Sequence, residues 1–185
     1  MWSMAASATP DDATPPPDND GLWASYAPGT ESPPFGTYAL LSSGFVAALG
    51  TFVFAQRRND DLPEIIPTRD LALMGAAAFK LSRLLTKEKV AAFMRAPFTE
   101  YQGNGEAPGE VEEKARGTGP RAAVGQLLTC PYCIGMWIVS LFTVGLVTAP
   151  RETRLVTSLL SALGLSDFLQ VGYRAAVARR EPTDS

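Results

Sequence analysis

The sequence predicts an all-α membrane protein with three or four transmembrane helices, one amphipathic helix and a disordered N-terminal tail. Two stretches, residues 32–56 and 122–150, contain no charged side chain, and each exceeds the roughly 20 apolar residues that a helix needs to cross a bilayer. A third apolar stretch follows the second after a short turn. No segment shows convincing strand alternation. Membrane-crossing helices therefore account best for the hydrophobic pattern.

Residues 1–34 are expected to form the disordered tail. They are rich in Pro, Ala, Ser and Asp and show no hydrophobic period, a composition that buries too little apolar surface to fold. The first 30 residues also lack the basic and apolar regions of a cleaved signal peptide, so we expect this end to be retained. Residues 1–56 contain five acidic residues and no Lys or Arg, which argues against a nucleic-acid partner.

The first transmembrane helix is predicted at residues 35–58, where an apolar run ends on two arginines that would lie among headgroups. Residues 59–94 then form a connector and an amphipathic helix. One stripe of that helix, at about 100° per residue, carries Arg69, Lys80, Arg83 and Lys87. We expect the helix to lie on anionic lipids at the membrane surface. In the alternative it crosses the membrane with this stripe facing other helices.

Residues 95–129 are predicted to form a cytoplasmic loop that offers a docking surface to a partner. Residues 95–120 are polar and rich in Gly and Pro, too irregular for a regular core element. The sequence RGTGPR invites a phosphate-binding interpretation, because Gly-rich loops expose backbone N–H groups. Neither a P-loop nor a dinucleotide-binding motif is present, so a solvated loop is the expected structure.

Residues 130–180 are predicted to form a transmembrane helical hairpin, with crossings at 131–149 and 155–173. Ser158, Ala162 and Ser166 form a small-residue stripe that we expect to pack against another helix. With the amphipathic helix on the surface, 14 of the 16 Lys and Arg residues share one side. The positive-inside rule then places the N-terminus outside and the C-terminus in the cytoplasm. If the amphipathic helix also crosses, nine basic residues lie inside and five outside.

The motif TCPYC suggests redox chemistry at Cys130 and Cys133. Pro131 suits the first position of a helix, where the helix dipole and free N–H groups stabilise a thiolate. The βαβ pattern that accompanies a catalytic CxxC is missing, so we favour a structural role. The sequence contains no His, which excludes Ser-His-Asp and Cys-His catalysis. A four-thiolate zinc site would need two chains.

Asp167 lies near the middle of the last predicted crossing. An uncompensated carboxylate at that depth is costly, so a partner is expected. Lys80 or Arg83 can supply an intramembrane ion pair if the amphipathic helix packs inside. We favour a polar contact that fixes helix register over proton or ion handling, because one carboxylate does not make a pathway.

Two segments, LSRLLTKEKVAAFMRAPFTEY and EVEEKARGTGPRAAVGQLLTCPYCIGMW, carry a family resemblance. They resemble a small bacterial integral-membrane family known as a domain of unknown function. The most specific positions are Arg95, Pro97, Phe98 and the CPxCxGxW pattern from Cys130 to Trp137. The resemblance covers roughly residues 70–176. It implies a membrane protein, and it implies no activity, cofactor or catalytic residue.

These observations lead to a bacterial inner-membrane protein, crossing several times, that acts as a structural or interaction component rather than an enzyme and uses no cofactor. The expected partners are the bilayer, with its anionic lipids, and a protein partner or a second copy of the chain. Two alternatives remain open. One is a membrane-bound thiol-disulfide redox protein that uses Cys130 and Cys133. The other is a small transporter or channel subunit that uses Asp167 with Lys80 or Arg83.

Overall fold

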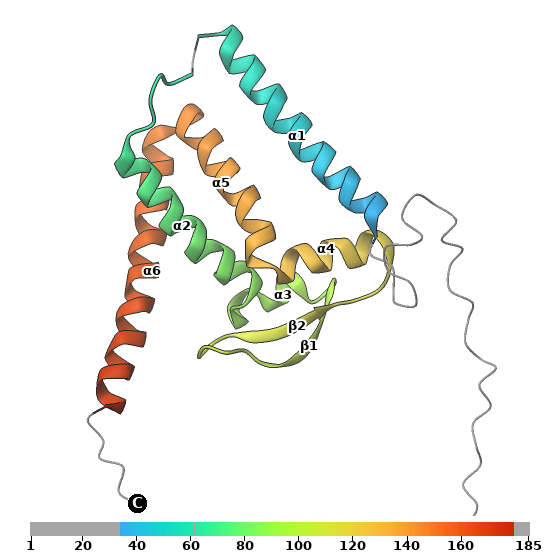
Figure 1. The fold of residues 1–185 in the computed structure, drawn as a ribbon, viewed down its shortest axis with the longest axis vertical. Helices are drawn as coiled ribbons and strands as arrows, with labels where there is room; N and C mark the ends of the chain where they lie inside the picture. Colours follow the sequence, from blue (N-terminus) through green and yellow to red (C-terminus); the bar gives the residue numbers. More distant parts are fainter. Residues whose placement is uncertain (1–33, 61, 180–185) are drawn as a thin grey trace, which may run out of the picture. The chain divides into compact units, whose positions relative to one another are not determined.

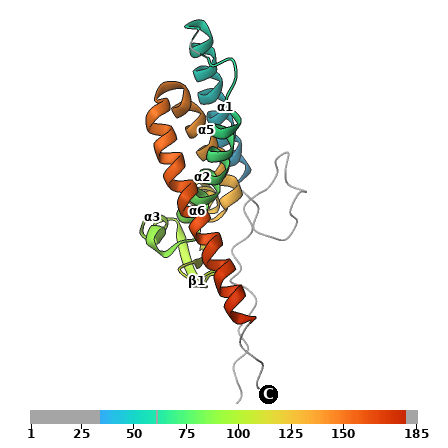
Figure 2. The same ribbon diagram turned by 90° about the vertical axis from the view of Figure 1, so that its left-hand side faces the viewer.

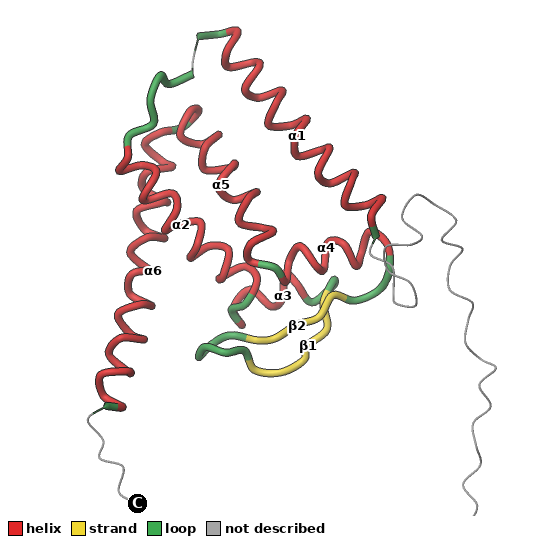
Figure 3. Tube along the Cα trace, viewed as in Figure 1, coloured by secondary structure: helices red, strands yellow, loops and turns green. Residues whose placement is uncertain are grey.

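The computed structural model of the chain describes residues 34–60 and 62–179. Its helices are α1 (Phe35–Arg58), α2 (Thr68–Thr86), the 3₁₀ helix η1 (Lys89–Ala91), α3 (Ala92–Arg95), α4 (Gly119–Thr129), α5 (Pro131–Thr148) and α6 (Pro150–Ala178), and its strands are β1 (Thr99–Asn104) and β2 (Val111–Ala115) (Figure 1). The predicted helical fold is confirmed, and the described chain adds one two-stranded sheet (Figure 3). The predicted disordered tail lies outside the described residues, apart from Pro34.

Among the described residues, three helices are long and apolar enough to cross a membrane: α1, α5 and α6. This confirms the expectation of three helices with the length and composition of membrane spans. Among the described helices, α2 is not apolar enough by the same measure, because its 19 residues include Arg69, Asp70, Lys80 and Arg83. The composition of α1, α5 and α6 is therefore enough to identify each as a candidate membrane span. The position of α2 has to be inferred from the helices that it packs against.

The long helices expose large apolar side chains to an extent that is unusual for a water-soluble protein. α1 has no buried residue, and large apolar side chains on the long helices are widely exposed, including Leu40 at 73%, Leu141 at 66% and Leu155 at 73%. The buried set contains Asp70, Lys80 and many Ser and Thr side chains. Soluble monomers seldom expose apolar surface on this scale, so the outer surface of these helices suits lipid.

α2 packs against both α5 and α6, and this contact contains the hydrophobic core (Figure 1). The core residues come from all three helices: Met74, Ala77 and Ala78 from α2, Ile138 and Phe142 from α5, and Leu160 from α6. Asp70, near the start of α2, binds Arg154, and Lys80, ten residues later, binds Asp167. α2 therefore runs parallel to α6 and antiparallel to α5. Of the basic stripe that was expected to face lipid headgroups, Lys80 is only 8% exposed, whereas Arg69 is exposed.

The packing face of α6 differs from the small-residue stripe expected at Ser158, Ala162 and Ser166. Its buried residues are Thr153, Thr157, Leu160 and Gly164, whereas Ala162 and Ser166 are exposed. A Cβ on Gly164 would lie 3.4 Å from the Cβ of Lys80. The expectation was wrong at these positions, because α6 meets α2 through Gly164 and through Ser161, whose hydroxyl donates to the carbonyl oxygen of Leu73 at 2.8 Å, while Thr153 lies against Gly145 of α5.

The expectation of an irregular loop at 95–120 was also wrong. β1 and β2 pair antiparallel, with Thr99 opposite Ala115 and Asn104 opposite Val111, and a bulge between Tyr101 and Gly103. α4 follows and lies against the hairpin so closely that a Cβ on Gly125 would be 2.5 Å from the carbonyl oxygen of Phe98. The predicted loop 95–129 therefore contains a folded unit, which we call the hairpin layer.

The hairpin layer lies at one end of the helices, which we call the hairpin end. It lies beside the C-terminal half of α6 (Figure 2), and α5 starts there directly after α4. The other end, which we call the turn end, holds the α5–α6 connection at Ala149 and the start of α2. α1 contacts α4 and α5, and the ring of Phe45 meets Trp137 edge-on at 4.8 Å.

Candidate functional site

Arg95 holds the end of α2 and β2 together at the hairpin end. Its side chain is 1% exposed, and its Nε donates to Glu113 Oε2 at 2.6 Å. Its Nη1 donates to the carbonyl oxygens of Leu85 at 2.8 Å and Glu88 at 3.2 Å. The last carbonyl groups of a helix have no partner within it, so the guanidinium satisfies acceptors at the end of α2 while it neutralises a buried carboxylate.

Three further ion pairs extend from Arg95 along α2, and we call the whole group the ion-pair cluster. Lys87 pairs with Glu112 at 3.0 Å, Arg83 pairs with Glu110, and Lys80 pairs with Glu88 at 2.5 Å. Three of the four carboxylates come from the segment Glu110–Glu113. The charges therefore fix the hairpin layer to the last two turns of α2 and the residues after it.

Lys80 and Asp167, which the sequence singled out, lie within bonding distance in the structure. Lys80 Nζ is 2.8 Å from Asp167 Oδ2, and the side chains are 10% and 53% exposed. Arg83, the other predicted partner of Asp167, binds Glu110 instead. Lys80 thus lies between the carboxylates of Glu88 and Asp167. Through Lys80, the contact between α2 and α6 is joined to the ion-pair cluster.

A cleft of about 440 Å³ opens beside this contact, and we call it the α2–α6 cleft. Its lining comes from α2, α6 and the hairpin turn: Phe79, Lys80, Arg83, Glu88, residues 107–110, Asp167, Phe168, Gln170, Val171 and Arg174. The rings of Phe79 and Phe168 stack at 5.5 Å on its apolar side. Within the part of the chain that the structure describes, Arg174 forms no salt bridge. The cleft therefore combines an apolar wall with one arginine that no carboxylate of the described residues engages.

The turn end has an ion pair that the sequence did not suggest. Arg154 Nε and Nη2 donate to Asp70 Oδ2 at 3.0 and 2.8 Å, and the aspartate side chain is only 5% exposed. Asp70 lies in the first turn of α2, where an acidic side chain also interacts favourably with the helix dipole. The two residues are 84 positions apart, so no local pattern could have paired them.

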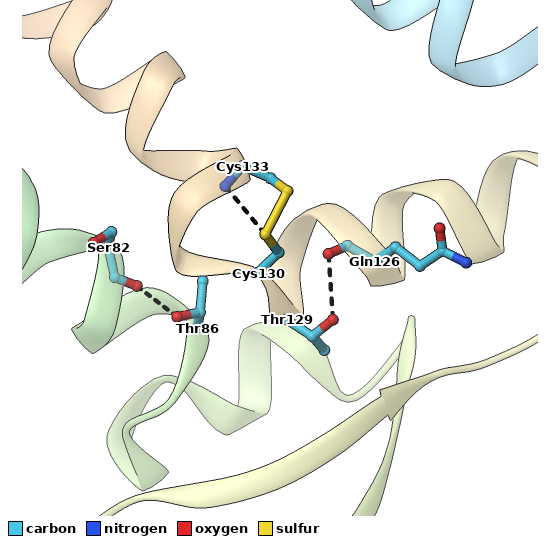
Figure 4. Close-up of a disulfide and its surroundings, with 6 residues drawn as sticks. All are labelled: Ser82, Thr86, Gln126, Thr129, Cys130 and Cys133. Atoms are coloured by element: carbon cyan, nitrogen blue, oxygen red, sulfur yellow. Dashed lines mark hydrogen bonds between the residues drawn. A yellow bond between two sulfur atoms is a disulfide. The ribbon is translucent and has the colours of Figure 1, made fainter. Parts of the chain in front are cut away.

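Cys130 and Cys133 form a disulfide at the start of α5 (Figure 4). Cys130 caps the helix, because the backbone N–H of Cys133 donates to its Sγ at 3.2 Å. Cys133 is exposed and Cys130 is half-buried. Figure 4 places the end of α2, with Thr86 bonded to Ser82, on one side of the disulfide and the end of α4 on the other. The predicted cysteine pair thus lies where three helices meet.

The comparisons with known proteins cover the segment from α2 to α6. A sporulation protein, YjcA, of Bacillus subtilis is 30% identical over 102 residues, which are 54% of this chain and 86% of that protein. The protein YngL of the same organism, described as a UPF0713 protein, is 27% identical over 101 residues, 55% of this chain and 75% of its own length. No solved structure matches the chain. Residues 73–173 match a family profile, and the chain belongs to the family described as "Protein of unknown function (DUF1360)".

Proposed function

We propose that the protein is a non-catalytic structural component of the bacterial inner membrane, and that its hairpin layer is a docking surface for a protein partner. The ion-pair cluster is the observation that carries this proposal. Each of its basic residues has a carboxylate partner, so these charges serve to hold a folded layer in place. Tyr101 of β1 is 62% exposed on that layer.

The packing of α2 supports four crossings rather than three. α2 lies along two helices that are apolar enough to cross, and its parallel direction to α6 brings its start to the turn end. In this arrangement the hairpin layer and both chain ends share the side with nine basic residues against five. We therefore propose that this side is cytoplasmic. The three-crossing alternative keeps α2 on the surface and places the N-terminus outside.

Single cysteines introduced into a Cys130→Ser, Cys133→Ser chain distinguish the two arrangements. In intact cells a membrane-impermeant maleimide labels Ser32→Cys under three crossings, whereas it labels Glu64→Cys under four. Glu152→Cys, in the first turn of α6, is the control, because both arrangements place it outside. Labelling of Ser32→Cys without labelling of Glu64→Cys would overturn the four-crossing proposal.

Docking is tested with a photo-crosslinking amino acid at Tyr101 in living cells. We expect one adduct of defined mass, which disappears when Arg95→Met releases the hairpin layer and persists when both cysteines are serine. The same amino acid at Leu159, an exposed residue of α6, is the matched control on the lipid-facing surface. Equal adducts at both positions would count against a specific docking surface.

A thiol-disulfide function is the second candidate, favoured by the bonded cysteine pair at the start of α5. In the reduced form the Cys130 thiolate would attack a disulfide of a substrate protein and release one thiolate, and Cys133 would then displace the second as the Cys130–Cys133 bond forms. Two electrons and two protons pass to the substrate. A Cys133→Ser chain would trap the mixed disulfide. If no mixed disulfide is trapped, and the double serine variant is as abundant as the unchanged protein, this candidate is excluded.

The transporter alternative gains less support. The Asp70–Arg154 pair and the Lys80–Asp167 pair lie at different levels of the α2–α6 contact, and Ala77 and Leu160 fill the space between them. The hydroxyl groups of Thr157 and Ser161 also lie between the two pairs, but they donate to backbone carbonyl oxygens of Thr153, Thr157 and Leu73 rather than to the ion-paired side chains.

A further inference from the structure

In the four-crossing arrangement proposed above, the α2–α6 cleft lies at the depth of the lipid headgroups. α6 has 29 residues and α5 has 18, and the two run antiparallel from Ala149. At about 1.5 Å per residue, α6 continues roughly 16 Å beyond the start of α5 at the hairpin end. Asp167 lies at the level of the start of α5, and Val171 and Arg174 line the cleft along this extension, so under the proposed membrane placement the cleft reaches the boundary of the apolar layer.

One charged side chain of the cleft lining has no ionic partner among the described residues. The carboxylates of Glu88 and Asp167 engage Lys80, and Glu110 engages Arg83. Arg174 is the remaining charged residue of the lining, and it forms no salt bridge with any described residue. A cation as ligand would find carboxylates that are already occupied. An anion would find a guanidinium with its donors free, which matches the geometry of a phosphate group.

The rest of the lining suits a hydrocarbon chain. Phe79 and Phe168 stack on each other and still expose 46% and 61% of their surface, and Val171 extends this apolar wall along α6. A ligand that satisfies both parts must carry a phosphate at one end and an apolar chain at the other. A membrane phospholipid has that chemistry, and it approaches such a cleft from the bilayer.

We propose that the α2–α6 cleft binds one anionic phospholipid, with its phosphate on Arg174 and an acyl chain against Phe79 and Phe168. The proposal rests on the membrane placement proposed above, since the cleft must lie at headgroup depth. It does not rest on the docking role of the hairpin layer. The sequence led us to expect contact with anionic lipids, and this proposal assigns that contact to a defined site between α2 and α6.

Native mass spectrometry of the full chain, released from nanodiscs that contain phosphatidylglycerol and phosphatidylcholine, tests the proposal. We expect one retained phosphatidylglycerol per chain and a loss of affinity of roughly tenfold in Arg174→Gln, which is what removal of one charged hydrogen bond costs. Arg179→Gln is the matched control, because it removes an equal charge directly after the same helix and outside the cleft lining. Arg174→Lys should recover part of the affinity.

Three outcomes would overturn the proposal. Equal losses in Arg174→Gln and Arg179→Gln would mean that only the overall charge attracts lipid. Retention of phosphatidylcholine as strong as that of phosphatidylglycerol would mean that the arginine does not select the headgroup. Displacement of the lipid by millimolar inorganic phosphate would mean that the site takes a free phosphate. Thermal unfolding of each variant in phosphatidylcholine alone shows whether the fold is intact, and the cysteine-labelling result separately tests the membrane placement.

Discussion

Arg95 and Glu113 form an ion pair that is almost completely removed from solvent, with side chains 1% and 6% exposed and 2.6 Å between Nε and Oε2. Thr99 adds a third group, because its hydroxyl lies 3.2 Å from the same carboxylate oxygen. A buried pair of this kind costs desolvation of both ions, and its disruption leaves a charge without compensation. The stability of the hairpin layer therefore depends on both members being present.

Replacement of Arg95 should destabilise the protein more than any other single change at the hairpin end. We expect Arg95→Met to lower the free energy of unfolding by about 3–5 kcal/mol, because Glu113 stays buried without a partner. Arg95→Met combined with Glu113→Leu should recover a large part of that loss. Thermal unfolding in detergent micelles measures both, with the exposed Arg116→Met as control. A double variant no more stable than Arg95→Met would contradict this account.

Lys80 should matter more for stability than Asp167, although they share one ion pair. Lys80→Met leaves the carboxylates of Glu88 and Asp167 without their common partner, so we expect a loss of several kcal/mol, on the order of other broken buried pairs. Asp167→Asn leaves Lys80 bonded to Glu88 and removes a half-exposed carboxylate, which should cost below about 1 kcal/mol. Unfolding of the two variants side by side checks the order, and the reverse order would mean that Asp167 has a role beyond this contact.

The close contact between α4 and the hairpin predicts that Gly125 tolerates no side chain. In Gly125→Ala the new Cβ would lie 2.5 Å from the oxygen of Phe98 and 2.9 Å from the Cβ of Ala115, so α4 must shift at a cost of about 1–3 kcal/mol. Gly135→Ala is the matched control, since nothing lies within 4 Å of its Cβ and alanine favours a helix. Protease sensitivity of the 105–110 turn and the melting temperature report the shift. A neutral Gly125→Ala would show that α4 is not held against the hairpin.

A double-mutant cycle on Asp70 and Arg154 tests the parallel packing of α2 on α6. We expect a coupling energy of about 1 kcal/mol or more between Asp70→Asn and Arg154→Gln, because the two side chains form a two-pronged contact with a buried carboxylate. The same cycle on Arg69 and Arg154 provides the control for unspecific charge effects. If the losses in the free energy of unfolding caused by Asp70→Asn and Arg154→Gln are additive, the start of α2 does not contact the start of α6.

The parts of the fold that the sequence predicted are those whose signal is local. α1, α5 and α6 each carry enough apolar residues to be recognised alone, and Cys130 and Cys133 are separated by only three positions. The hairpin escaped prediction because β1 reads TEYQGN, and its buried position is Thr99 rather than an alternating row of apolar side chains. Its folding depends on carboxylates that meet α2, and such pairs leave no trace in a local pattern.

The packing faces were harder to predict for a different reason. α6 has small residues on several sides, so the stripe Ser158, Ala162, Ser166 was as plausible from the sequence as the observed one at Thr153, Thr157 and Gly164. The choice depends on where α2 approaches, and that approach is fixed by Asp70 with Arg154 at one level and Lys80 with Asp167 at another. The partner of Arg83 likewise lies in a segment, at Glu110, for which no structure was expected.

The charges of α2 also constrain the order of events when the ribosome makes this chain. Asp70 precedes its partner Arg154 by 84 residues, which take roughly 4–17 seconds to synthesise at 5–20 residues per second. Until α5 and α6 emerge, α2 has neither the apolar surface to remain in the bilayer nor a partner for its charged groups. In the four-crossing arrangement α1 is inserted first. α2 enters the membrane only after α5 and α6 have been made, because α6 supplies the partners of Asp70 and Lys80.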